Sequence, residues 1–119
     1  MNIFNQTQLK TVKLPFAHVR MVHAIIQTNA AFIRYKSQAH KSLNGKLQLA
    51  KDRTQKHQFA LIKVTAEECK LFRDYNDHYC TILSTNMQAF EREYGIADQN
   101  GVETYILATE TYLLFSSVK

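Results

Sequence analysis

Glycine and proline are scarce in this chain, with three Gly and one Pro among 119 residues. The three glycines, Gly45, Gly95 and Gly101, stand apart, so no glycine-rich loop is present to hold a phosphate or a dinucleotide. Few turn-forming residues and a hydrophobic content of 45% also argue against long disordered linkers. Because a second core would leave each unit below about 60 residues, we expect residues 1–119 to form a single domain.

Long apolar runs are absent, and cysteine is limited to two residues. No stretch approaches the roughly 18 apolar residues of a membrane span, and the first residues lack a basic segment followed by an apolar run. Cys69 and Cys80 fall on one predicted helix about 16 Å apart, which is too far for a disulfide. We therefore expect a cytoplasmic protein with reduced thiols and no membrane contact.

Catalytic and metal-binding patterns are also missing. His78 and Cys80 are two residues apart on a predicted helix and diverge by about 200°, so they cannot hold one metal ion together. Asp74 and Asp77 share a helix side with Lys70, which is typical of a solvated face. We expect no enzymatic activity, no cofactor and no metal site.

Acidic residues are almost absent from the first half of the chain. Residues 1–64 contain eleven Lys and Arg against Asp52 alone, for a net charge of +10, whereas residues 65–119 contain four bases and nine acids, for a net charge of −5. Such asymmetry indicates a polyanionic partner for the basic half.

The clearest structural signal is a helix over residues 66–94. Thr65 and Glu68 have the spacing of a capping box, and Gly95 can take the left-handed conformation that ends a helix. Large apolar residues recur at three- and four-residue steps between these ends, forming one stripe. Four members of the stripe are expected to be mostly buried: Phe72, Tyr79, Leu83 and Phe90.

A second helix is predicted from Pro15 to about Lys41, because proline suits a first helical turn and apolar residues follow at helical spacing. This segment has no charged residue between Met21 and Ile33, and the longer helix has none between His78 and Phe90. We expect these two uncharged stretches to contact each other.

Short apolar and β-branched runs predict the strands of an α+β fold, with two long helices packed on a small antiparallel sheet in the split βαβ, ferredoxin-like order. Asn44-Gly45 is a turn signal, and the two runs that follow it are expected to pair as a hairpin. The predicted strands are Gln8–Leu14, Lys46–Lys51, Gln58–Val64 and one or two strands within Val102–Val118.

An all-α four-helix bundle is the alternative, because Leu43, Leu47 and Leu61 also share a helical face, as do Val102 and Ile106. Periodicity alone cannot assign such short runs. The β-rich composition near the carboxyl end favours the α+β fold.

The candidate functional stretch runs from Arg34 to His57, where Lys and Arg residues are interspersed with an aromatic residue and only Asp52 opposes them. Lys and Arg neutralise phosphates, and an aromatic ring can stack on an unpaired base, so this mixture predicts contact with a nucleic-acid backbone with little sequence specificity. The alternative is that these charges only complement a helix end and keep the surface soluble. The candidate binding residues are Arg34, Tyr35, Lys36, Lys41, Lys46, Lys51, Arg53 and Lys56.

A protein partner is the competing hypothesis. Tyrosine-rich amphipathic helices suit interfaces, including those of homo-oligomers, and an acidic protein surface would complement the basic half. The chain would then be a small interaction module, an inhibitor or a subunit of a larger complex, of a size typical of such proteins in phage and mobile elements.

Overall fold

The computed structural model describes residues 9–116. Four helices and two strands occur within this range, so the fold is α+β, as predicted from the sequence. In chain order they are β1 (Lys10–Pro15), α2 (Phe16–Ala30), α3 (Gln38–Arg53), β2 (Phe59–Val64), α4 (Ala66–Tyr94) and α5 (Gln99–Ser116).

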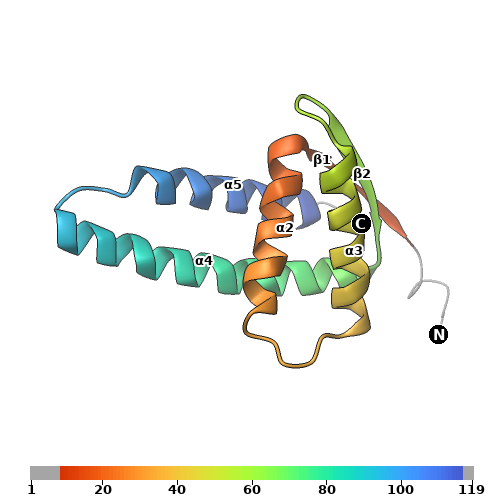
Figure 1. Cartoon of the computed structure of the whole chain (residues 1–119), viewed down its shortest axis with the longest axis horizontal. Helices are drawn as coiled ribbons and strands as arrows, with labels where there is room; N and C mark the ends of the chain where they lie inside the picture. The colour runs from red at the N-terminus through yellow and green to blue at the C-terminus, as the bar shows by residue number, and fades with distance from the viewer. Residues whose placement is uncertain (1–8, 117–119) are drawn as a thin grey trace.

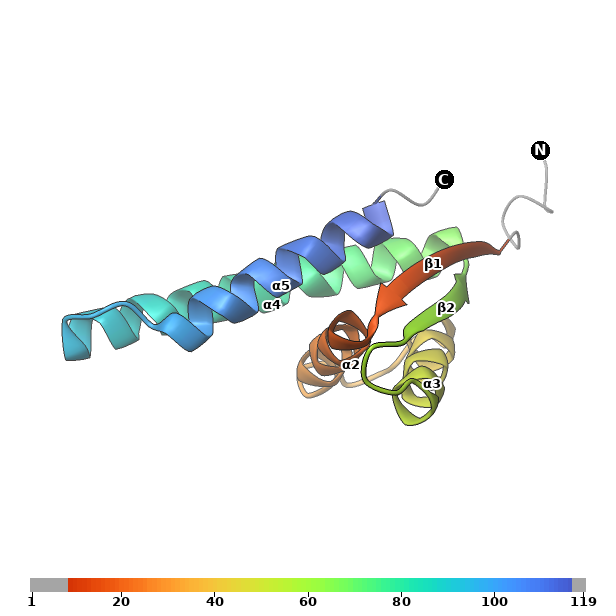
Figure 2. The same cartoon turned by 90° about the horizontal axis from the view of Figure 1, so that it is seen from above.

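The molecule consists of a head and a projecting arm (Figures 1 and 2). The head contains β1, α2, α3, β2, the beginning of α4 and the end of α5. The arm, residues 81–106, is the part of α4 and α5 beyond Cys80 and Leu107, which still pack against the core; in it the two helices run antiparallel to each other away from the head. The long arm makes the molecule elongated, with principal extents of 54, 34 and 23 Å.

The sheet is a single antiparallel pair of strands, in which Lys10 lies opposite Val64 and Pro15 lies opposite Phe59. Because side chains alternate along a strand, the sheet has one buried and one exposed face. The buried face carries Val12, Leu14, Ala60, Ile62 and Val64.

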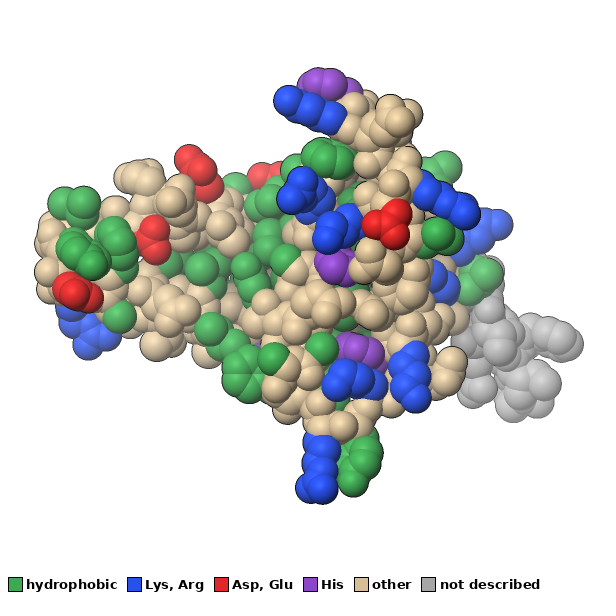
Figure 3. Space-filling view, viewed as in Figure 1, with side chains coloured by type: hydrophobic (Ala, Val, Ile, Leu, Met, Phe, Trp, Pro, Cys, Tyr) green, Lys and Arg blue, Asp and Glu red, His purple; other side chains and the backbone are tan. Residues whose placement is uncertain are grey.

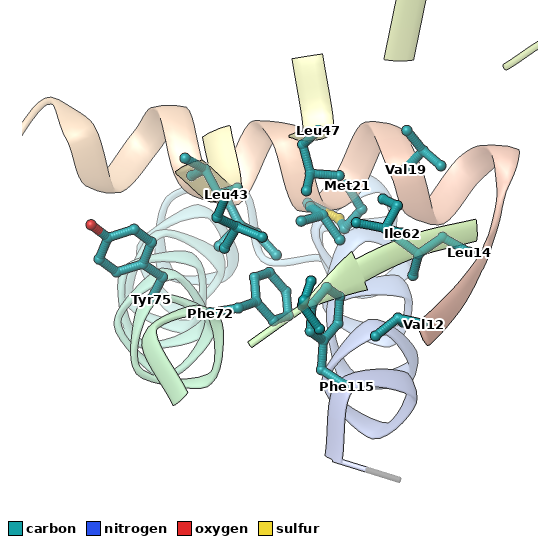
Figure 4. Packing of buried hydrophobic residues seen from close by; sticks show 14 of the residues in the cluster. Val12, Leu14, Val19, Met21, Leu43, Leu47, Ile62, Phe72, Tyr75 and Phe115 are labelled. Carbon is teal, nitrogen blue, oxygen red and sulfur yellow. The ribbon is translucent and has the colours of Figure 1, made fainter. Parts of the chain in front are cut away.

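The core lies where this sheet face meets the four helices (Figure 4). Phe72 of α4 and Phe115 of α5 are fully buried, and their ring centroids lie 4.2 Å apart. Leu43 and Leu47 of α3 reach the same cluster. Apolar residues far apart in the sequence therefore form one continuous core.

The predicted helix over residues 66–94 is confirmed at both ends. Thr65 Oγ1 accepts a hydrogen bond from the Glu68 backbone, and Glu68 Oε1 accepts one from the Thr65 backbone, which completes the capping box. Gly95 ends the helix with φ of 70°. These contacts are local in sequence, which is why they could be predicted without the tertiary structure.

The expected burial of the long stripe is correct for only part of the helix. Phe72 is fully buried, but Tyr79, Leu83 and Phe90 are only half-buried. The reason is that Cys80 is the last residue of α4 that packs against the core of the head, and beyond it α5 is the only described element that lies alongside α4 (Figures 1 and 2).

The predicted helix from Pro15 to Lys41 is wrong as a single element. It ends at Ala30, and a new helix begins after Ser37, whose hydroxyl accepts a hydrogen bond from the His40 backbone. This N-cap was a signal in the sequence that the periodic pattern concealed. The expected contact between the uncharged stretches is confirmed at one end, where Asn29 and Phe32 contact His78.

The strand predicted over Lys46–Lys51 is also wrong, because this segment is the second half of α3. Asn44-Gly45 is helical rather than a turn, and Asn44 Oδ1 accepts a hydrogen bond from Gln27 of α2. The partner of β2 is therefore β1, and no hairpin forms between residues 46–51 and 58–64.

The segment Val102–Val118, predicted as strand, is helical through Ser116, and residues 117–118 lie outside the described range. Its Thr and Ser hydroxyls donate to carbonyl oxygens four residues back, as from Thr104 to Asn100 and from Thr109 to Tyr105, which satisfies these polar groups within the helix. Packing against α4 thus overrides the β-rich composition. The ferredoxin-like order is not confirmed, and the helical interpretation of residues 102–113 is the one the structure shows.

The other two strand predictions are confirmed within about two residues. Gln8–Leu14 corresponds to Lys10–Pro15, although Gln8 lies outside the described residues, and Gln58–Val64 corresponds to Phe59–Val64.

None of the helices within residues 9–116 is long and apolar enough to cross a membrane.

Candidate functional site

The predicted basic residues do not form one compact cluster. Arg34, Tyr35 and Lys36 lie in the connection between α2 and α3, and Lys56 lies in the turn after α3. The remaining predicted residues, Lys41, Lys46, Lys51 and Arg53, lie on α3 itself. Since α3 has 16 residues and is about 24 Å long, the two ends of the predicted stretch are well separated. In Figure 3 the blue Lys and Arg side chains are accordingly spread over the head, with most of the visible acids on the arm.

A groove between α3 and β2 collects some of these residues. Its volume is about 350 Å³, and its charged lining consists of Lys46 and Arg53 from α3 together with Lys63 from β2. Lys46 and Arg53 are seven residues apart and therefore share one face of the helix. Leu49 and Leu61, both exposed, add apolar surface to the same groove.

The exposed face of the sheet extends this groove. Arg53 and Leu61 also border a second depression whose lining includes Lys13 and Phe59. Phe59 is 56% exposed, and the Lys13 ammonium lies 4.3 Å from the centroid of its ring. We call this continuous surface the head groove; its members are Lys13, Lys46, Leu49, Arg53, Phe59, Leu61 and Lys63.

Sequence reasoning found only two of the charged members of the head groove, Lys46 and Arg53. It missed Lys13 and Lys63, which belong to different strands and come together only because β1 pairs with β2. The period-two pattern of residues 58–64 was a usable signal for part of the site, since it places Phe59, Leu61 and Lys63 on one face.

Lys46 is less available than the other cations of the head groove. Its ammonium lies 2.8 Å from Oε1 of Glu68, a side chain that is almost fully buried. Burial by itself raises the pKa of Glu68, but hydrogen bonds from Lys46, the Thr65 backbone and Ser42 outweigh it, so the net pKa is lowered. Lys46 thus neutralises a buried carboxylate and holds the start of α4 against α3.

Three cations of the head groove remain free of such pairing. None of the ion pairs found within residues 9–116 involves Lys13, Arg53 or Lys63. Asp52, the single acid on α3, instead accepts a hydrogen bond from Gln48. The positive charge of the head groove is therefore available to an anionic ligand.

The other end of α3 carries a smaller basic and aromatic surface. Tyr35 is 81% exposed, and the Arg34 guanidinium lies 5.5 Å from its ring centroid. Lys36 donates a hydrogen bond to the backbone carbonyl of Ile33. These three residues cannot contact the same short segment of ligand as Arg53, because the length of α3 separates them.

Two thiols and one buried histidine are the remaining candidates for chemistry. The pKa values of the Cys69 and Cys80 thiols are raised, mainly by burial. A raised pKa disfavours a thiolate nucleophile at either position. His40 is buried between α3 and α4, with Nδ1 2.6 Å from the Tyr75 hydroxyl. Within the described residues, no three His, Cys, Asp or Glu side chains gather into a cluster that could hold a metal ion.

The burial of His40 predicts a pH-dependent stability. The pKa of His40 is lowered from 6.5, mainly by burial and to a smaller extent by the charge of Lys36. The imidazole of His40 therefore binds a proton more readily in the unfolded chain than in the folded chain. The contribution of neutral, buried His40 to the free energy of unfolding is fully present above about pH 6.5. It is lost progressively as the pH falls toward the pKa that His40 has in the folded protein. Melting temperatures measured between about pH 7.5 and pH 5.5 should therefore decrease, and His40→Gln should make this dependence weaker. The exposed His57, replaced by Gln, is the control; an equal change there would contradict the assignment to His40.

Comparison with protein-family models, with curated proteins and with solved structures finds no match to this chain. What the fold and the site define is a small α+β protein with a basic, partly apolar groove on its head and a two-helix arm.

Proposed function

We propose that this protein binds a nucleic-acid backbone through the head groove, with little sequence preference and without catalysis. The observation that supports this most directly is the placement of Lys13, Arg53 and Lys63, three unpaired cations, around exposed Phe59 and Leu61. Lys and Arg at such a surface neutralise phosphates and release counterions.

The geometry favours a single strand over a duplex. Phe59 lies on an exposed sheet face, where an unpaired base can stack on its ring while the flanking cations contact phosphates. Lys13 and Lys63 of the head groove lie on strands rather than on a helix that could enter a major groove, so base edges would contribute little. Lys51 and Lys56, exposed on and just after α3, would extend the contact to neighbouring phosphates.

The proposal is tested by titrating the whole protein into labelled single- and double-stranded DNA and RNA at about 50 mM salt and then at higher salt. Each phosphate contact contributes about −0.7 to the slope of log K against log salt for a single strand. Three contacts therefore predict a slope near −2, and five predict one near −3.5. Binding that does not weaken with salt, or no binding at about 50 µM protein, would contradict the proposal.

An acidic protein segment is the second candidate, because Leu49 and Leu61 give the head groove an apolar floor beside its cations. An amphipathic acidic helix would match both features. The nucleic-acid titration separates the two, since this candidate predicts no affinity for the labelled strands.

A further inference from the structure

The outer side of α5 is an apolar stripe that none of the described elements covers. At 100° per residue its members fall within about 120° of the helix circumference, away from the side that packs on α4 and the core. Tyr105, Ile106 and Leu113 are 41%, 52% and 60% exposed. The stripe consists of Val102, Tyr105, Ile106, Thr109, Tyr112 and Leu113.

This stripe is unusual for a surface helix. Buried residues of α5, such as Ala108 and Phe115, lie roughly 100–120° around the helix from the middle of the stripe, so apolar residues extend well beyond the side that packs on the core. Its charged residues are Glu103 and Glu110, and both fall beside the stripe rather than within it. A helix with two apolar sides is normally covered on both of them.

The neighbouring surface of α4 is also suited to contact. A groove of about 440 Å³ lies between α4 and α5, with Tyr105 on one side and Asp77, Cys80, Thr81, Ser84 and Thr85 on the other. Small side chains at this position would allow the ridge of another helix to approach closely. In Figure 2 no other described element lies over the side of the arm that faces away from α2 and α3.

We propose that a second copy of this chain covers the stripe, with the two α5 helices antiparallel about a two-fold axis near Thr109. The two α4–α5 hairpins would then form a four-helix bundle, with both heads left on the outside. An isologous interface requires a self-complementary patch, and an uncharged stripe with Thr109 near its middle meets this requirement. Glu110 lies beside the stripe, one residue from this axis, where its carboxylate is 3.2 Å from His18 Nε2 of α2 in its own chain.

Charge complementarity favours a second copy as the occupant. Antiparallel pairing brings the acidic end of each arm, with Glu91, Glu93 and Asp98 around Arg92, toward the start of α4 in the other copy. Lys10 and Arg73 lie near the start of α4, where the charge of each opposes the raised pKa of Cys69. Lys10 and Arg73 would thus give the acidic end of the other copy two cations to face in an antiparallel arrangement.

The available area predicts a weak dimer. Three large side chains of roughly 200 Å² each, about half exposed, contribute roughly 300 Å² per copy. Two copies supply about half of the 1,200 Å² that specific interfaces need at minimum, and the rest of the stripe with the α4 groove would supply the remainder. We therefore expect a dissociation constant in the micromolar range, on the order of 10 µM.

Size-exclusion chromatography with light scattering, from about 5 to 200 µM, tests this arrangement over the range in which such a dimer would form. The mass should rise from 13.8 kDa toward twice that value, whereas Ile106→Lys/Leu113→Lys should stay monomeric because its dissociation constant rises at least about 100-fold. Leu49→Lys on α3, at 48% exposure, is the matched control and should dimerise normally. Circular dichroism establishes that each variant is folded.

A covalent test locates the axis independently. Thr109→Cys in a Cys80→Ser background, oxidised with copper phenanthroline, should yield a disulfide-linked dimer, since a residue near a two-fold axis meets its own copy. Lys51→Cys in the same background should not. Three results would overturn the proposal: a monomer at every concentration, dissociation caused by Leu49→Lys, or equal cross-linking at residue 51. A monomer at every concentration would mean that a different protein or another segment of this chain covers the stripe.

Discussion

Replacing Phe72 with Ala is expected to lower the free energy of unfolding by about 3–5 kcal/mol. Phe72 is fully buried, its ring stacks against that of Phe115, and Leu43 and Val12 lie in the same cluster (Figure 4). The truncated side chain would leave a cavity where α3, α4, α5 and the sheet meet, and elements on all sides would lose contacts. Equilibrium denaturation with urea, followed by circular dichroism, measures the change.

Phe90→Ala is the matched comparison, because it makes the same truncation on the same helix but in the arm. Phe90 is only half-buried, and its ring contacts Tyr94, itself 60% exposed. The expected cost is about 1–2 kcal/mol, since less apolar surface returns to water. Equal costs for the two substitutions would show that the arm is packed as completely as the head, either within one chain or against a second copy at the concentration used.

Removing two cations from the head groove with Arg53→Gln/Lys63→Gln should weaken nucleic-acid binding at 50 mM salt by roughly 60-fold. One phosphate contact to a single strand, with a slope of 0.7, raises the association constant about 8-fold when the salt concentration falls from 1 M to 50 mM. The factors for two such contacts multiply to roughly 60-fold. The slope of log K against log salt should decrease by about 1.4 at the same time. Fluorescence anisotropy with the labelled strand of highest affinity measures both quantities.

The control variant is Arg73→Gln/Arg92→Gln, which removes the same charge from α4, outside the head groove. It should weaken binding by less than about 5-fold, through long-range electrostatics only. If both double variants weaken binding equally, the total charge of the protein rather than the head groove determines affinity.

Local signals predicted about half of the secondary structure. The capping box at Thr65, the stop at Gly95 and the apolar period between them depend on neighbours within four residues, so α4 could be predicted with its exact ends. The alternation of Gln58–Val64 also predicted a strand, because alternate burial follows from the geometry of a single chain segment.

Segments whose patterns suit both helix and strand were decided by their packing partners. Lys46–Lys51 has an alternating pattern and Val102–Val118 is rich in β-branched residues, so both patterns also suit a strand. In the structure the first segment belongs to α3, which packs on α2, and the second, as far as Ser116, belongs to α5, which packs on α4. Once a helix on each of these surfaces buries Leu47 or Phe115 in the core, the gain exceeds the modest preference of the segment for a strand.

The sequence by itself determined the complete extent of α4, the division of charge near residue 65 and the basic character of residues 34–57, because each depends on composition or on residues close in the chain. It favoured the α+β class but left the all-α bundle open. Only the tertiary structure decided that β1 pairs with β2, that Lys13 and Lys63 join Arg53 in one groove, and that half of α4 projects from the head. The paired residues of β1 and β2 are 44 to 54 positions apart in the chain. The energies of such contacts depend on which apolar surfaces bury one another, and local patterns do not contain this information.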